Sequence, residues 1–150
     1  MWLKNFCKAL ACMAVAACLG ITAWAADSVV LLETLEHKTP GIVELADFSS
    51  GTSARVTGAV RTTVSANSIK AIGEDISLDA GETVTFDCTY SPSSASMDFG
   101  LVAPNGRFYY INVTGGSINK TIQIEERGTY TVAIMNNSSS AVAVTGTVQY

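Results

Sequence analysis

The run Thr83-Val84-Thr85-Phe86-Asp87-Cys88-Thr89-Tyr90 decides the fold class of this 150-residue chain. Apolar and polar residues alternate along it, and a β-strand places successive side chains on opposite faces. The pattern therefore predicts a strand whose four apolar side chains share the core face. Turn-forming residues bracket it, with Asp79-Ala80-Gly81-Glu82 before the strand and Ser91-Pro92-Ser93-Ser94 after it.

The same alternation continues in both directions, and no window of comparable length shows apolar residues at helical spacing. Eight strand patterns follow one another between turn signals, at residues 55–64, 76–78, 84–90, 97–103, 107–111, 118–124, 130–134 and 142–150. Short strands at this spacing are typical of a sandwich. We expect an all-β fold, a jelly-roll-like β-sandwich of about seven to nine antiparallel strands over residues 53–150. Gly58 is a candidate bulge, and residues 26–52 predict an N-terminal arm or a short edge strand.

The N-terminus has the order of a secretory signal: Lys4 and Lys8, then an apolar run, then Ala23-Trp24-Ala25. We expect residues 1–25 to be a signal peptide and the protein to be secreted, extracellular or at the cell surface. Two alternatives remain open. Cys18 could carry a lipid anchor, because Val15-Ala16-Ala17-Cys18 resembles a lipoprotein signal. Alternatively, the 18 uncharged residues from Ala9 to Ala26 could stay as a membrane anchor, which needs about 20 residues.

Charge and cysteine content narrow the range of partners. Of nine Lys and Arg residues, Lys4 and Lys8 leave with the signal, so seven remain against 13 Asp and Glu, a net charge of about −6. An acidic protein without a basic patch is a poor ligand for nucleic acid. We expect contact with a membrane only during export, unless Cys18 is lipidated. Cys88 is the one cysteine left after cleavage, and its place in an apolar row predicts a buried thiol.

Three segments in the second half resemble a known module: Gly81-Glu82-Thr83-Val84, Met97-Asp98-Phe99-Gly100-Leu101-Val102-Ala103-Pro104-Asn105-Gly106 and Gly128-Thr129-Tyr130-Thr131-Val132. In this order they are similar to the bacterial pre-peptidase C-terminal domains and related small extracellular jelly-roll modules, over residues 74–150. The resemblance implies a jelly-roll fold and an accessory role beside secreted hydrolases. It carries over no functional residue, because this chain has no attached hydrolase and its Glu74, Asp75 and Asp79 only loosely match the acidic calcium cluster of the collagen-binding relatives.

Catalytic constellations are missing from the sequence, and we expect the protein not to be an enzyme. With one histidine, His37, and one cysteine after cleavage, the chain cannot supply an ordinary zinc site. No Gly-x-Ser-x-Gly elbow accompanies His37. The strand alternation places Asp87 and Asp98 on outward faces, where solvated carboxylates are the expected finding.

Two groups of residues are candidates for binding. We expect no cofactor apart from calcium, for which Glu74, Asp75, Asp79 and Glu82 could supply oxygen ligands around one turn. The second candidate is a ligand-binding surface, in which an aromatic ring lies among polar side chains and could stack on a sugar or receive a peptide: Tyr109, Arg107, Asn105 and Asn112. A covering of one ring by the N-terminal arm around residues 29–32 is the alternative reading.

These features predict a secreted, non-enzymatic binding or accessory module for a cell-wall or matrix polymer, with an extracellular polysaccharide or protein as partner. One alternative is a cell-envelope protein that self-associates through the exposed edge of the final Val- and Thr-rich strand. The other is a lipid-anchored surface protein.

Overall fold

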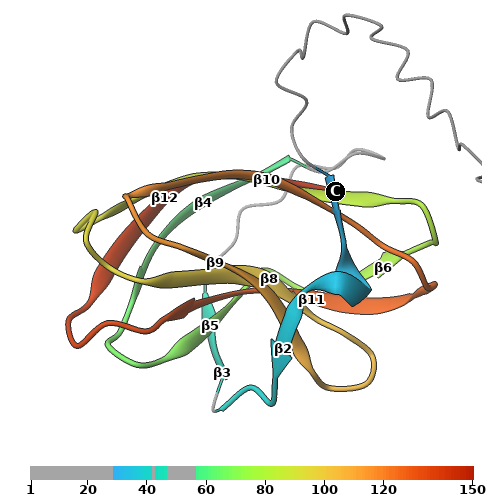
Figure 1. The fold of residues 1–150 in the computed structure, drawn as a ribbon, viewed down its shortest axis with the longest axis horizontal. Coiled ribbons are helices and arrows are strands. Elements are labelled where there is room, and N and C mark those ends of the chain that lie inside the picture. The colour runs from blue at the N-terminus through green and yellow to red at the C-terminus, as the bar shows by residue number, and fades with distance from the viewer. Residues whose placement is uncertain (1–28, 42, 47–56) are drawn as a thin grey trace, which may run out of the picture.

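The computed structural model describes residues 29–41, 43–46 and 57–150, which form a two-layer β-sandwich (Figure 1). The predicted signal peptide and Cys18 lie outside the described residues. No helix in the described part of the chain is long and apolar enough to cross a membrane. The expected all-β sandwich is confirmed.

Two sheets face each other across the core. One has five strands in the order β1 (Val29–Leu31), β10 (Ser117–Gln123), β7 (Thr83–Ser91), β12 (Val142–Gln149) and β4 (Thr57–Val64). The other has seven, in the order β2 (Glu36–Lys38), β9 (Phe108–Val113), β8 (Met97–Val102), β11 (Gly128–Asn136), β5 (Ile69–Ile72) and β3 (Val43–Ala46), while β6 (Ile76–Leu78) pairs with the start of β11.

Alternating side chains fill the space between the sheets. The four side chains of β7 that were predicted to face the core are each at most 5 % exposed, and β8 places Phe99 opposite them. The Phe99 ring lies 6.0 Å from Phe86 and 6.1 Å from Tyr90, centroid to centroid. Each fully buried apolar side chain contributes about 1.5–3 kcal/mol relative to exposure, so this interleaving stabilises the sandwich.

The described residues contain twelve strands, and nine of them, β4 to β12, lie in the expected domain of residues 53–150. Eight of these nine correspond to the predicted patterns, and β5, with four residues, is additional. The other three, β1, β2 and β3, lie in the segment for which an arm or a short edge strand was expected. The expectation of antiparallel pairing is wrong at two places, because β1 pairs in parallel with β10 and β3 with β5.

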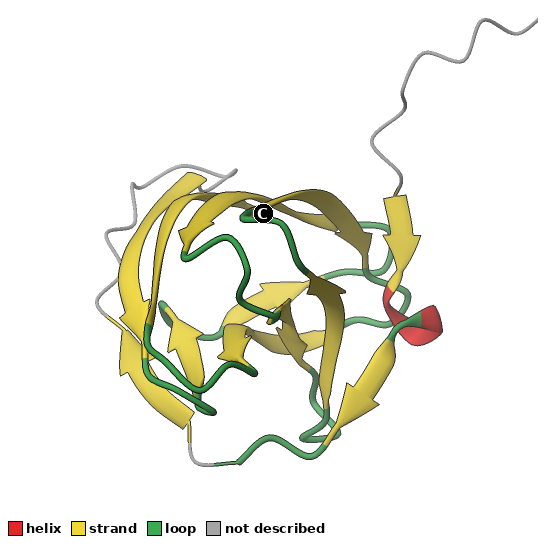
Figure 2. Ribbon diagram, turned by 60° about the vertical axis from the view of Figure 1, so that its left-hand side comes forward, coloured by secondary structure: helices red, strands yellow, loops and turns green. Residues whose placement is uncertain are grey.

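The N-terminal segment spans the two layers. β1 joins an edge of the five-stranded sheet, a 3-10 turn η1 (Leu32–Thr34) follows, and β2 joins an edge of the seven-stranded sheet. Figure 2 shows this turn at the side of the sandwich, between those two strands. Leu32 is 4 % exposed and belongs to the main core. The segment is therefore packed against both sheets.

Two predictions about strand edges are wrong. The final strand β12 is not an edge: it pairs with β7 on one side and with β4 over its full length on the other. Gly58 is not a bulge, because the β4–β12 register runs without interruption from Thr57 to Val64. The sequence could not show either point, since an edge or a bulge depends on which strands pair side by side and in which register.

Cys88 is a buried structural thiol, as expected, with 1 % exposure and its Sγ 3.6 Å from the Thr147 carbonyl oxygen. Burial, followed by the charge of Asp87, raises the pKa of the Cys88 thiol from 9.0 to about 11.

We predict that the raised pKa of Cys88 lowers the free energy of unfolding above pH 9. The unfolded thiol ionises near pH 9 whereas the folded thiol resists ionisation until about pH 11, so the stabilisation present below pH 9 is lost as pH rises through that window. Urea unfolding should show a steeper decline between pH 9 and 11 for the wild type than for Cys88→Ala. Parallel declines would contradict the burial.

Gly146 of β12 lies where only glycine fits. Its φ is +154°, and an added Cβ would come within 2.2 Å of the Asp87 carbonyl oxygen and 2.5 Å of the Cys88 Cα. Both neighbours are backbone atoms of β7 and cannot move aside without disturbing the sheet.

We predict that Gly146→Ala lowers the free energy of unfolding by about 2–3 kcal/mol, through backbone strain and overpacking. Gly41→Ala is the matched control, because nothing lies within 4 Å of its added Cβ. Chemical denaturation measures both variants. Equal effects would contradict the close approach of β12 and β7.

Candidate functional site

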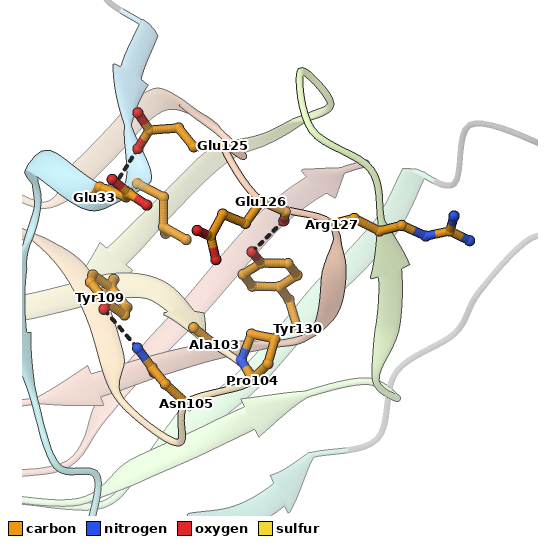
Figure 3. A pocket seen from close by; sticks show the side chains of 10 residues that line it. Glu33, Ala103, Pro104, Asn105, Tyr109, Glu125, Glu126, Arg127 and Tyr130 are labelled. Carbon is orange, nitrogen blue, oxygen red and sulfur yellow. Dashed lines mark hydrogen bonds between the residues drawn. The ribbon is translucent and has the colours of Figure 1, made fainter.

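A pocket of about 370 Å³ opens where three connections meet, and it contains two of the sequence-predicted ligand residues (Figure 3). The 3-10 turn forms one wall, the β8–β9 hairpin the second and the β10–β11 turn the third. The residues that line it are Leu32, Glu33, Ala103, Pro104, Asn105, Tyr109, Glu125, Glu126, Arg127 and Tyr130.

The β8–β9 hairpin presents Tyr109 and Asn105 to the pocket. Asn105 Oδ1 accepts a hydrogen bond from the Arg107 backbone N–H at 2.9 Å, which holds the tight turn. Its Nδ2 donates to the Tyr109 hydroxyl oxygen at 2.9 Å. The turn and the tyrosine are therefore fixed together, and the hydroxyl hydrogen of Tyr109 can be directed to a ligand.

Three carboxylates give the pocket a negative character. Glu125 Oε2 accepts the Glu33 backbone N–H at 2.8 Å, which ties the 3-10 turn to the β10–β11 turn. Glu126 lines the pocket and is exposed. The one cationic lining residue, Arg127, points away from the cavity in Figure 3 and pairs with Asp79 at 3.0 Å.

Tyr130 forms the floor of the pocket and reports the local charge. Its ring is 2 % exposed, and its hydroxyl donates to the Glu126 carbonyl oxygen at 2.7 Å. Burial raises the pKa of Tyr130 above its usual 10, and the negative charges of Glu126 and Glu33 raise it further. The charges of Glu126 and Glu33 thus both reach the Tyr130 hydroxyl.

A partly buried ion pair attaches β2 to the outer face of the seven-stranded sheet. Lys38 Nζ lies 2.5 Å from Asp98 Oδ2, and the Asp98 side chain is 1 % exposed. Asn112 Nδ2 donates to the other oxygen, Oδ1, at 2.6 Å. The prediction that Asp98 is a solvated carboxylate is therefore wrong: its direction is outward, but Lys38 and Asn112 cover it.

The same lysine contacts the outward aromatic rings of β9. Lys38 Nζ lies 4.3 Å from the Tyr110 ring centroid and 5.9 Å from that of Phe108, and the two rings stack at 5.4 Å. Phe108 is 0 % exposed. Contacts between a cation and a ring face are favourable, so Lys38 is held by the rings as well as by the carboxylate.

Tyr109 lies on the opposite side of β9, with Ile111 and Val113, and packs against the core between the sheets. The His37 ring packs against the Tyr109 ring with the centroids 5.0 Å apart and the planes tilted by 34°, and Arg107 Nη1 lies 2.7 Å from His37 Nε2. The N-terminal segment therefore does contact a ring of β9, as the alternative reading proposed. The covering residues are His37 and Lys38, which follow the expected 29–32 stretch.

The four predicted ligand residues are thus divided. Asn105 and Tyr109 line the pocket, whereas Arg107 does not line it and contacts His37 instead. Asn112 is on the other face of β9, bonded to Asp98. The glutamates of the pocket were missed, because they come from turns whose meeting depends on the tertiary fold.

The four predicted calcium ligands do not converge either. Asp75 accepts a hydrogen bond from the Thr131 hydroxyl, Asp79 pairs with Arg127, and a Glu82 oxygen accepts the Asp79 backbone N–H at 2.6 Å. Among the described residues, no group of three or more His, Cys, Asp or Glu side chains is placed to hold a metal ion.

Comparison with known proteins gives one structural likeness. No family model matches the chain, and no curated protein matches it. The fold is similar to the crystal structure of Aeromonas hydrophila PliG, a periplasmic lysozyme inhibitor of g-type lysozyme. The TM-score is 0.46 and the identity 12 %, over 81 % of this chain and 97 % of that one.

We predict that Lys38→Met lowers the free energy of unfolding by about 2–3 kcal/mol, because it leaves the buried Asp98 carboxylate without its cation. Arg127→Met removes a cation of the same charge from an ion pair whose side chains are 86 % and 66 % exposed. That control should cost less than about 1 kcal/mol. Denaturant unfolding of both variants measures the difference, and similar losses would show that the Lys38 pair is solvated.

Proposed function

We propose that this protein is a secreted, non-enzymatic binding module, and that the pocket between the 3-10 turn and the two strand connections is its ligand site. The observation that carries the proposal is the composition of that pocket. It combines a tyrosine hydroxyl positioned by Asn105 with carboxylates from Glu33, Glu125 and Glu126.

The ligand that suits this pocket is a positively charged side chain of a protein. Carboxylates form charge-assisted hydrogen bonds with ammonium and guanidinium groups, and tyrosine offers both a ring and a hydroxyl. The net negative charge of the chain would attract a basic partner. A cavity of about 370 Å³ has room for one long side chain rather than a folded segment.

A second hollow of about 370 Å³ is less suited to this role. The residues that line it are Thr57, Gly81, Glu82, Thr83, Thr85, Gln149 and Tyr150. It has a single carboxylate, Glu82, against three in the first pocket. The hydroxyl groups of this hollow suit a neutral ligand, but one carboxylate offers a cation little negative charge.

Titration of the protein with a tri-lysine peptide and with a tri-glutamate peptide tests the proposal. We predict that tri-lysine binds better, and that Glu126→Gln weakens its binding about fivefold, the effect of losing roughly 1 kcal/mol of ion pairing. Asp87→Asn is the matched control. It removes the same charge from the exposed outer face of the five-stranded sheet and should leave the affinity nearly unchanged.

Two results would contradict the proposal. One is equal affinity for the two peptides. The other is retention of the protein on peptidoglycan, chitin, cellulose, mucin or collagen with no dependence on Glu126. That second result would support a polymer-binding module that uses a different face.

A further inference from the structure

The edge of β4 stands out among the sheet edges of the described residues. The two sheets end in β1, β4, β2 and β3. Three of these strands have only three or four residues, whereas β4 has eight, all in register with β12 on its inner side. A long edge strand exposes a row of unpaired backbone groups to another chain.

Neighbouring contacts show which backbone groups of β4 face outward. The carbonyl oxygens of Thr145 and Thr147 accept contacts from β7 side chains, so these odd-numbered residues of β12 face β7. The even-numbered residues of β12 therefore face β4, where Val144 lies opposite Thr62 and Gly146 opposite Val60. It follows that the odd-numbered residues of β4 direct their N–H and C=O groups away from the sheet.

One contact confirms this direction independently. The Thr63 carbonyl oxygen accepts a hydrogen bond from Lys70 Nζ at 3.1 Å, and Lys70 belongs to the other sheet. The outward row consists of Thr57, Ala59, Arg61 and Thr63. Lys70 blocks only its last carbonyl.

The usual devices that protect an edge are scarce in β4. The strand contains no proline, its register has no bulge, and Arg61 is its one charged residue. Val60 and Val64 are buried toward the core, so an incoming strand would meet backbone and, apart from Arg61, small outward side chains.

We propose that β4 pairs antiparallel with β4 of a second copy of this chain, around a two-fold axis at Val60. This register is self-complementary. It places each outward residue opposite another outward residue, Ala59 opposite Arg61 and Thr57 opposite Thr63, and puts no like charges directly across from each other. The two five-stranded sheets then join into one continuous sheet of ten strands. Two-fold pairing of identical surfaces is the commonest form of protein assembly.

Sedimentation equilibrium of the whole protein up to about 1 mM tests this interface. A dimer with a dissociation constant of about 1 mM has a binding free energy of about 4 kcal/mol, so a dimer that is not detected there is weaker than this. Ala59→Glu places a carboxylate opposite the partner's Arg61, and Ala59→Lys places an ammonium there. Each change occurs twice in the dimer at about 0.2–1 kcal/mol per pair. We expect Ala59→Glu to tighten the dimer about fivefold and Ala59→Lys to weaken it by a similar factor.

Ala59→Pro provides a second variant, because it removes an outward N–H that the β4–β12 ladder does not use. It should abolish the dimer while the thermal unfolding midpoint of the monomer stays within a few degrees. A monomer at every concentration would overturn the proposal. So would shifts of Ala59→Glu and Ala59→Lys in the same direction, which would reflect strand propensity rather than a facing Arg61.

Discussion

The ion pair between Lys38 and Asp98 is the interaction on which the arrangement of the site depends. A carboxylate with 1 % exposure on the outer face of a sheet is tolerated only when a cation and hydrogen-bond donors satisfy it. Lys38 supplies the cation from β2, and Asn112 supplies a donor from β9. The strand that carries Lys38 is consequently held against the sheet, and with it the turn that forms one wall of the pocket.

Docking of the N-terminal segment also joins the two layers. Leu32 enters the core between the sheets, while the Glu33 backbone bonds to Glu125 at the opposite wall. Each strand of this segment has only three residues, too few for stable pairing alone. The position of this segment therefore depends on the contacts of Leu32, Glu33 and Lys38, and the pocket is the space that these contacts leave open.

Much of the fold could be predicted from the sequence, because alternation over six or more residues specifies both strand and face. The rows of β7, β8 and β11 face the core as their patterns indicate. Strand β5 and the individual strands of the N-terminal segment could not be predicted, since three or four residues carry too little periodicity, whereas the equally short β6 was predicted because the turn at residues 79–82 follows it. Asn136 shows a related limit. It is 0 % exposed, and its Nδ2 donates to carbonyl oxygens of Val64, Ser65 and Ser140, yet its sequence context indicates only a turn.

The site was predicted less completely than the fold, for the same physical reason. Asn105 and Tyr109 could be associated because they lie four positions apart in one hairpin. The glutamates at positions 33 and 125 are 92 residues apart and meet through the docking of the N-terminal segment. Alternation likewise gave the outward direction of Asp98 correctly, but it could not reveal that another strand covers it.

Hydrogen–deuterium exchange of the backbone amides in residues 29–38 tests most directly whether this segment is a docked wall of the pocket. We expect the amides of β1 and β2 that pair with β10 and β9 to exchange far more slowly than those of a free peptide, with opening energies close to those of their partner strands. Exchange at the free-peptide rate, with β9 and β10 still protected, would show an undocked segment and contradict the account of the site.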